Sequence, residues 1–371
     1  MMQKLFNVYS NNNMLDGISE IINSGQIASG TYVAEFEKKF GEVLNVENSL
    51  SVNNMTSAIE LALYLCGVKE GEEVLATSYN CLASTSSLAR VNAAITWVDL
   101  EEHSPLICIE DLKKKISLKT KALLLYHPAG YVSDILRIKK ICDENDVVLI
   151  EDCNNTFLAS SDGVSAGSVG DFSIFSLYPN RPVNGLEGAI LKIKDDENFA
   201  RAKKLRRFGI DPDSFRGLDG EINPDSDVSE IGQSFNFNNL SAYTALCNLD
   251  DLVKRNDKIR SNAALYRELL IETHDFRVVK NREGQENSYW VFFILSKRRS
   301  ELLDELKNLS IQASILHFPN HTYSAFNAGM EVMLSNTSNF YNEVIALPVG
   351  YWLNYEDIKY IADVINEFNK R

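Results

Sequence analysis

The sequence lacks long apolar segments. No run approaches eighteen consecutive apolar residues, and residues 1–15 contain no apolar core of the signal-peptide kind. We therefore expect neither a membrane span nor a secretory signal. The six cysteines are scattered without a Cys-x-x-Cys pair, which argues against a disulfide framework or a structural zinc site. A reducing cytoplasm is the expected location.

Positive charge is also scarce. The 371 residues include 51 Asp and Glu against 37 Lys and Arg, which gives a net charge of −14. Because most of such a surface would repel a phosphate backbone, we expect no nucleic-acid partner. The sequence contains neither a G-x-G-x-x-G motif nor a P-loop, so the usual nucleotide-cofactor fingerprints are missing.

Up to about residue 195, short apolar runs alternate with segments of helical periodicity. This alternation predicts an α/β fold, in which a mostly parallel sheet is covered by helices on both faces. Ligands of such folds gather at the carboxyl ends of the strands. The predicted strands are residues 72–76, 94–98, 122–126, 147–150, 172–176 and 189–194, and the predicted helices are 33–40, 57–66, 82–91 and 135–142.

The pattern changes after residue 195 and predicts a smaller α+β domain. We therefore divide the chain into a large α/β domain with an N-terminal arm, residues 1–240, and a smaller C-terminal domain, residues 241–371. The predicted elements of this part are helices 199–208, 240–254, 257–270, 301–306 and 356–368, strands 288–295 and 312–317, and a polar connection over 214–229.

Three groups of residues fall at predicted strand ends or helix starts. Asn53–Ser57, with Thr56 and Ser57, precedes a predicted helix whose N-terminus suits a phosphate group. Asp152 lies just after the predicted strand 147–150 and could hold a protonated ring nitrogen, as an Asp does for a pyridoxal cofactor. The alternatives are a plain helix cap and a carboxylate that caps nearby amides.

The third group is the stretch Asp171–Glu187, where a short strand ends at Ser176 and a loop with one basic residue, Arg181, follows. A hydroxyl and a fixed cation in this arrangement suggest an anionic cofactor, and the alternative is a surface turn with a solvated Arg. Each of the three groups is weak alone, but they occur in an order that indicates a phosphate cradle, a ring-nitrogen carboxylate and a second phosphate contact.

The histidines are weaker candidates. His317 and His321 are four residues apart, but Pro319 prevents a shared helix face, so we do not predict a zinc pair. His127 follows the strand 122–126, and we expect it to be a structural residue with satisfied hydrogen bonds. We predict no metal site.

As a set, these segments resemble the DegT/DnrJ/StrS family, fold-type I pyridoxal-phosphate aminotransferases that act on nucleotide-linked keto-sugars. The resemblance implies a fold-type I architecture, cofactor contacts from Thr56, Ser57, Asp152 and Ser176, and a homodimer with its active site at the interface. The matching segments are 24–30 (SGQIASG), 54–58 (NMTSA), 150–152 (IED), 170–176 (GDFSIFS), 205–209 (LRRFG), 232–242 (GQSFNFNNLSA) and 346–348 (ALP).

The departures from the family pattern fall on the cofactor site. The position of the lysine that forms the Schiff base with pyridoxal phosphate is held by Arg181. A guanidinium stays protonated and its lone pairs are delocalised, so Arg181 cannot form the covalent bond to the cofactor. Cys81 stands where an aromatic residue stacks on the pyridine ring, and Asn155 replaces the usual Gln. We expect the next lysines along the chain, Lys192 and Lys194, to point to solvent.

Three hypotheses follow for the function. The first is a protein that processes nucleotide sugars for surface polysaccharides or deoxy-aminosugars, with pyridoxal or pyridoxamine phosphate bound non-covalently or not at all. The second is a catalytically silent sugar-nucleotide binder or partner subunit. The third is a conventional keto-sugar aminotransferase that uses another lysine. Whether the chain is itself an enzyme therefore depends on position 181.

Overall fold

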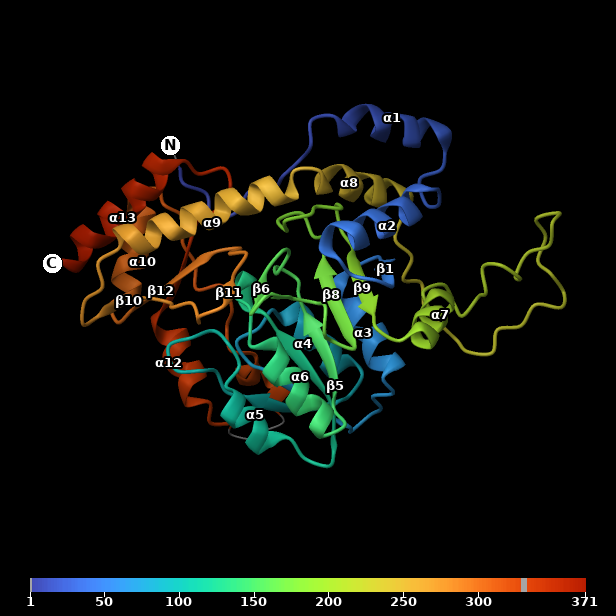
Figure 1. Cartoon of the computed structure of the whole chain (residues 1–371), viewed down its shortest axis with the longest axis horizontal. Coiled ribbons are helices and arrows are strands. Elements are labelled where there is room, and N and C mark those ends of the chain that lie inside the picture. The colour runs from blue at the N-terminus through green and yellow to red at the C-terminus, as the bar shows by residue number, and fades with distance from the viewer. Residues whose placement is uncertain (1, 328–331) are drawn as a thin grey trace.

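A seven-stranded mixed sheet forms the centre of the computed structural model, which describes residues 2–327 and 332–371 (Figure 1). Its strands are β1 (Ser49–Val52), β2 (Glu73–Thr77), β3 (Ala94–Val98), β4 (Thr120–Tyr126), β5 (Val148–Asp152), β8 (Phe172–Ser176) and β9 (Ala189–Ile193). They lie in the order β1-β9-β8-β5-β4-β2-β3. Strands β3, β2, β4, β5 and β8 are parallel, whereas β9 is antiparallel to both β8 and β1.

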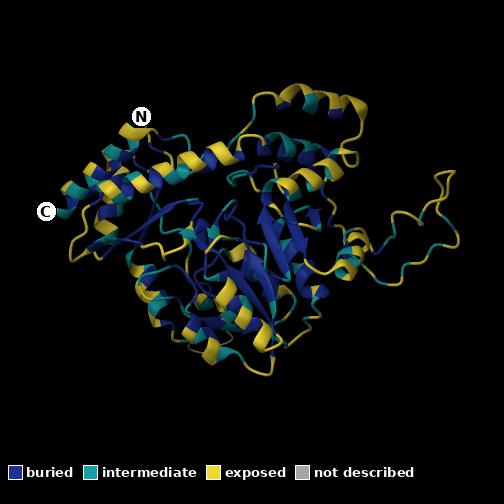
Figure 2. Cartoon of the chain, viewed as in Figure 1, coloured by how far each residue is buried: buried dark blue, intermediate teal, exposed yellow. Residues whose placement is uncertain are grey.

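Helices cover both faces of this sheet. They are α2 (Tyr32–Leu44), α3 (Met55–Leu65), α4 (Leu82–Arg90), α5 (Ile109–Lys115), α6 (Ile135–Glu144), α7 (Asp196–Leu205) and α8 (Asn239–Leu249), and α1 (Met14–Ser24) packs on α8. Within β4, Ala122 and Leu124 belong to the core shared with α3, while Leu123 and Leu125 belong to the core shared with α5 and α6. Because successive side chains point to opposite faces, a strand buried on both sides needs an unbroken apolar run. The sheet is accordingly the most buried part of the molecule in Figure 2.

The C-terminal part is built on a second, antiparallel sheet. Its strands are β10 (Phe276–Val278), β12 (Phe292–Ser296) and β13 (Val344–Leu347), and its helices are α9 (Leu252–Leu269), α10 (Arg299–Asn308), α12 (Ser335–Glu343) and α13 (Tyr355–Asn369). One hydrophobic core joins these elements and includes Leu5 of the N-terminal arm. Both termini lie on this side of the molecule in Figure 1. The domain boundary at residue 240 remains a prediction, and α8, which spans it, packs on α2 and α1.

The shorter elements lie at the edges of this framework. They are strands β6 (Ser160–Ser161), β7 (Val164–Ser165) and β11 (Gln285–Glu286), which form a small sheet, the helix α11 (Ser324–Asn327), and two 3-10 turns at Pro128–Gly130 and Asn320–Thr322. The polar connection predicted over 214–229 contains an isolated bridge between Arg216 and Ile222 and extends away from the body of the molecule in Figure 1.

Two predicted elements are wrong. Residues 312–317 do not form a strand: Ser314 makes only an isolated bridge to Ala346, and Leu316 adopts a left-handed backbone with φ of 54° that interrupts the extended run. The break between the two long helices lies at Asp250–Asp251, before the predicted position. The carbonyl of Asn248 accepts a hydrogen bond from Arg255 Nη2 at 2.6 Å, so a side-chain contact completes the end of α8.

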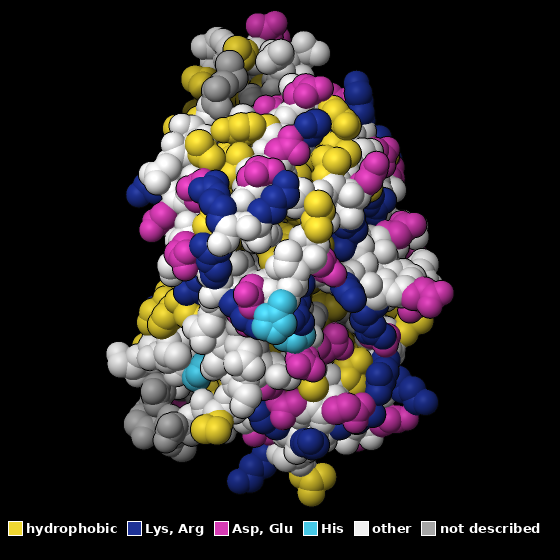
Figure 3. Space-filling view, turned by 90° about the vertical axis from the view of Figure 1, so that its left-hand side faces the viewer, with side chains coloured by type: hydrophobic (Ala, Val, Ile, Leu, Met, Phe, Trp, Pro, Cys, Tyr) yellow, Lys and Arg dark blue, Asp and Glu magenta, His cyan; other side chains and the backbone are white. Residues whose placement is uncertain are grey.

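The surface mixes charges of both signs. On the face drawn in Figure 3, Lys and Arg side chains are interspersed with Asp and Glu side chains. None of the helices in residues 2–327 and 332–371 combines the length and the apolar character that a membrane crossing requires.

Candidate active site

Asp152 is the last residue of β5 and is fully buried at the carboxyl edge of the central sheet. Its Oδ2 accepts a hydrogen bond from Ser84 Oγ on α4 at 2.6 Å, and its Oδ1 accepts one from the Asn154 amide at 3.2 Å. Burial raises the pKa of Asp152 above its ordinary value, although both hydrogen bonds act in the opposite direction. A protonated partner would stabilise this carboxylate, as the prediction for Asp152 requires.

The predicted phosphate cradle lies at the N-terminus of α3. Asn54 is the N-cap, and its side chain accepts a hydrogen bond from the Ser57 amide at 2.8 Å. Thr56 Oγ1 donates to the carbonyl of Ala83 at 3.4 Å, which brings this helix end beside the start of α4. Capping satisfies only one of the free amides, so the helix end still offers donors and a positive dipole to an anion.

Cys81 and Asn155 are the other two positions at which the chain departs from the family pattern. Cys81 occupies the N-cap position of α4 without a capping hydrogen bond from its side chain. Burial raises the pKa of its thiol, and the nearby carboxylate of Asp152 raises it further, while Arg181 lowers it. The thiol is therefore neutral at physiological pH. Asn155 is buried, and its Oδ1 has no hydrogen-bond partner among the described residues.

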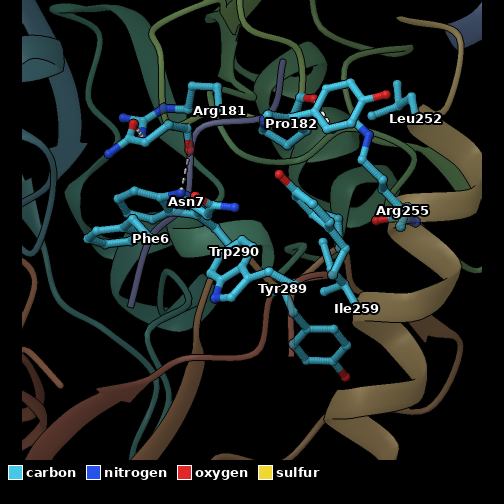
Figure 4. Close-up of a pocket in the computed structure, with 16 residues that line it drawn as sticks. Phe6, Asn7, Arg181, Pro182, Leu252, Arg255, Ile259, Tyr289 and Trp290 are labelled. Carbon is cyan, nitrogen blue, oxygen red and sulfur yellow. Dashed lines mark hydrogen bonds between the residues drawn. The ribbon is translucent and has the colours of Figure 1, made fainter. Parts of the chain in front are cut away.

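Ser176 and Arg181 lie at the end of β8. Ser176 is buried, and its Oγ accepts a hydrogen bond from the Tyr178 amide at 3.3 Å. Arg181 Nη1 donates to Asn180 Oδ1 at 2.7 Å, and the guanidinium stacks on the Trp290 ring at 4.5 Å. Figure 4 shows Arg181 on one side of the indole and Phe6 on the other. The loop is therefore fixed from outside the central sheet, and Arg181 is not the solvated residue of a surface turn.

Electrostatic coupling places these groups in one site. Burial lowers the pKa of Arg181, while Cys81, Tyr126 and Asp152 act on it in the opposite direction. The structure thus brings Arg181 and Asp152 near each other, as the strand-end argument predicts, and Cys81, which the family resemblance adds, lies near both. An apolar pocket on one side of Arg181 is lined by the N-terminal arm, α9, residues 288–290 and 350–352, and Asn180–Pro182.

Sequence reasoning missed His317 as a neighbour of this site. Its Nε2 and the Tyr126 hydroxyl share a hydrogen bond of 3.1 Å, although the two residues are 191 positions apart. Burial, and secondly the charge of Arg181, lower the pKa of His317 to about 3. Its position two residues before Pro319 offers no local signal in the sequence for this role. His321 binds Ser78 instead, with 2.6 Å between Nδ1 and Oγ, so the two histidines do not form a pair.

We expect His317 to make stability depend on pH. In the unfolded chain a His takes up a proton near pH 6.5, whereas folded His317 does so only near pH 3. Stability should therefore fall as pH drops between these values, by at most about 1.4 kcal/mol per pH unit from this residue. Urea unfolding of the natural chain and of His317→Gln between about pH 4 and 7 measures the difference. Equal slopes in the two proteins would contradict the assignment.

His127 is a structural residue, as predicted. Its Nε2 lies 3.1 Å from Glu151 Oε2, and its Nδ1 accepts a hydrogen bond from the Ser133 amide at 3.3 Å. In the described residues, one group has potential metal-ligand atoms within 4.8 Å of one another: His127, Glu151 and Cys153. Glu151 already accepts hydrogen bonds from the amides of Gly167 and Gly170 at 2.9 and 2.6 Å. These bonds give the carboxylate a structural role.

The expectation for Lys192 is wrong. Lys194 is exposed, but Lys192 is buried, and its Nζ donates to the carbonyls of Ser168 and Gly170 at 3.3 and 3.0 Å. The side chain points to the interior because β9 is antiparallel to β8 and places Lys192 beside Ser173, near the start of β8. Lys192 therefore lies beside the start of β8, whereas Ser176 and Arg181 lie at and beyond its end.

The sheet order, with a buried Asp at the end of β5 and a hydroxyl at the end of β8, gives the chain a fold like that of the fold-type I aminotransferases. The chain belongs to the DegT/DnrJ/EryC1/StrS aminotransferase family, whose profile matches residues 9–366.

Individual relatives agree with this assignment over nearly the whole chain. The GDP-perosamine synthase of Vibrio cholerae is 28% identical over 360 residues, which is 95% of each protein. The crystal structure of AtS13 from Actinomadura melliaura superposes with a TM-score of 0.92, at 29% identity, over 99% of this chain and 98% of that one. The sugar aminotransferase CalS13 from Micromonospora echinospora, at 24% identity, has the same fold, with a TM-score of 0.92 over 99% of this chain and 100% of that one.

The residues at the strand ends fit a pyridoxal-type cofactor. Asp152 has a raised pKa and would be stabilised by a pyridinium nitrogen. In the loops that follow β2, β5 and β8, the side chains of Asn80, Asn155 and Arg181 each carry at least one buried polar atom without a partner in the described part of the chain. Buried polar atoms are normally satisfied, so these atoms are suited to a polar ligand.

Proposed function

We propose that this chain processes a nucleotide-linked sugar with pyridoxal or pyridoxamine phosphate held without a covalent bond. The observation that carries the proposal is Arg181, which the family resemblance places at the position of the cofactor-binding lysine. A guanidinium neither loses its proton nor attacks an aldehyde at physiological pH. Lys192 is engaged with two carbonyl groups at the other end of β8, so it does not replace that lysine.

Several residues of the chain would hold the cofactor. Asp152 would bind the protonated ring nitrogen, Thr56, Ser57 and Ser176 would bind the phosphate, and Asn155 would offer its free Oδ1 to a donor. Such a cofactor, when bound, supplies an electron sink and an amino group for chemistry at a sugar carbonyl. Cys81 would contact the ring without the stacking that an aromatic residue gives.

Arg181 changes what the chain itself can do. A lysine at this position would also move protons during transamination, and a permanently charged guanidinium does not. Arg181 instead binds and orients a negative group. The neutral His317 and the Tyr126 hydroxyl share a hydrogen bond beside it and are the groups that could position a water or a sugar hydroxyl.

Two alternatives come from the same site. Conventional aminotransferase activity is favoured by the retained Asp152 and Ser176 and is compatible with the relatives. A silent sugar-nucleotide binder, or a partner subunit in a dimer, is favoured by Arg181 and Cys81, which remove the covalent bond and the ring stacking. We also propose that the protein is cytoplasmic and forms a homodimer.

The absorbance spectrum of the purified protein, followed by borohydride reduction and intact-mass measurement, distinguishes these functions. We expect a saturable spectral change with pyridoxamine phosphate and no reduced adduct on any lysine after addition of pyridoxal phosphate. Asp152→Ala is the control, because loss of the ring-nitrogen partner should weaken the spectral change. A reduced adduct on a lysine would restore the conventional aminotransferase, and no binding of either form would leave the silent binder.

A further inference from the structure

Arg181 is built into the site as a charged group with unused donors. Its Nη1 is occupied by Asn180 Oδ1, and one face of the guanidinium is covered by Trp290. Its Nε is buried and has no partner among the described residues, in which no carboxylate oxygen lies within 4 Å of the guanidinium. Asn180 uses one N–H group of Nη1, so the edge formed by Nε and Nη2 is the side of the guanidinium with a pair of free donors.

Three other partly buried arginines have an acidic partner or acceptors for both Nη groups, although the Nε of Arg255 also lacks a partner among the described residues. Arg206 pairs with Glu37 at 2.7 Å, and Arg201 donates through Nε to Glu230 at 2.7 Å. Arg255 stacks on Tyr9 at 3.7 Å and uses both of its Nη groups on carbonyl oxygens. Compared with these side chains, Arg181 lacks both an acidic partner and a second acceptor.

The surroundings of Arg181 hold its guanidinium in one orientation. Trp290 Nε1 donates to the Asn180 carbonyl at 2.9 Å, so the same side chain fixes both the loop and the stacked cation. Phe6 stacks on Trp290 with ring centroids 4.4 Å apart, and Figure 4 shows the three side chains in layers. A guanidinium held in this way retains its planar fork of donors, the geometry that matches a carboxylate or a phosphate.

We propose that the Nε–Nη2 edge of Arg181 is a binding site for an oxyanion, a carboxylate or phosphate group of the ligand bound at the strand ends. The inference deepens the proposed function and rests on it, because it names the chemistry that Arg181 contributes once covalent attachment is lost. The anion would offset the charge that Arg181 carries in a desolvated place, where burial already lowers its pKa. It would also lie beside Cys81, Tyr126 and Asp152.

Calorimetric titrations with glutarate, inorganic phosphate, pyridoxamine phosphate and unphosphorylated pyridoxamine test this site. We expect Arg181→Gln to weaken the binding of an oxyanion roughly 10- to 100-fold, because a charge-assisted pair of hydrogen bonds is lost. Arg181→Lys keeps the charge but loses the planar pair of donors. Its oxyanion affinity should therefore lie between those of the natural chain and of Arg181→Gln. Arg137→Gln, which removes an exposed arginine, is the matched control and should bind as the natural chain does.

The probes distinguish the sources of the anion and the two proposals. A loss confined to pyridoxamine phosphate assigns the site to the cofactor phosphate, and a loss for glutarate assigns it to a carboxylate of the substrate. Oxyanion binding that depends on Arg181 without any pyridoxamine phosphate binding would support this site and overturn the proposed function. Equal affinities of Arg181→Gln and the natural chain for all the oxyanions, in proteins with matching circular dichroism, would overturn the site alone.

Glutarate binding should be independent of pH between about 7 and 9, because both carboxyl groups of glutarate are ionised and Arg181 remains charged throughout this range. A structural role of Arg181 alone would not give an affinity for glutarate that depends on the guanidinium. Trp290→Phe keeps an aromatic surface but removes the donor to Asn180, and we expect it to weaken glutarate binding less than Arg181→Gln does. An affinity unchanged by both substitutions would contradict the site.

Discussion

Replacing Arg181 by Lys is expected to give a chain that binds pyridoxal phosphate covalently, where the natural chain forms no reducible adduct. A lysine amine can lose its proton and attack the aldehyde, and desolvation at this site lowers the pKa of an amine. The guanidinium of Arg181 cannot do either. Reduction with borohydride, followed by intact mass and peptide mapping, should find one cofactor per chain at residue 181.

Two control variants make this result specific. Arg181→Gln has no amine and should give no adduct, and Arg137→Lys adds a lysine at an exposed position and should not be labelled there at the same cofactor concentration. A folded Arg181→Lys protein without an adduct at residue 181 would contradict the assignment of this position to the cofactor aldehyde. Labelling of Lys192 in the natural chain would show that β9 moves far from its place in the structure.

Replacing Glu151 by Gln should lower the free energy of unfolding by about 1–3 kcal/mol, because it leaves a buried donor without its acceptor. Glu151 is fully buried and accepts hydrogen bonds from His127 and from two backbone amides, so a Gln places an NH2 group against a donor. Urea unfolding measures the change. Glu110→Gln is the control, because the Glu110 side chain is 64% exposed and its surface pair should contribute about 1 kcal/mol or less.

The pH dependence of this contribution has a definite sign. Burial alone raises the pKa of Glu151, but the contacts with His127, Gly167 and Gly170 bring it below its ordinary value. The stabilisation is therefore present above about pH 4.5 and is lost as the pH falls through the folded value. The difference in stability between the natural chain and Glu151→Gln should shrink on acidification. A loss below about 1 kcal/mol at neutral pH would show that the buried network is replaceable.

Oxyanion binding and the loss of the cofactor lysine, both proposed for Arg181, would be two consequences of one substitution. If Arg181 binds a carboxylate or a phosphate, a fixed positive charge replaces the covalent attachment of the cofactor at this site. This charge would favour ligands that bring their own negative group to the strand ends. The Cys81 position is consistent with this exchange, because its small neutral thiol leaves room that a stacking aromatic residue would fill.

Local sequence patterns predicted six of the seven strands of the central sheet and the strand ends that carry candidate site residues. The apolar runs that predicted β4, β5 and β8 exist because these strands are buried on both faces, and their polar last residues necessarily lie at one edge of a parallel sheet. Asp152 and Ser176 could therefore be placed together from the sequence. The same reasoning located Arg181 just beyond a strand end, and elementary chemistry excluded it as an amine.

Tertiary contacts decided what the patterns could not. His317 reaches Tyr126 across 191 positions, and Trp290 holds Asn180 and Arg181 from 110 positions away. Lys192 is buried because two carbonyl groups receive its charge, and the end of α8 is set by the side chain of Arg255. Periodicity reports only which face of an element is apolar. Which distant side chain satisfies a buried polar group depends on the packing of the whole chain, and this is how the structure defines the surroundings of Arg181.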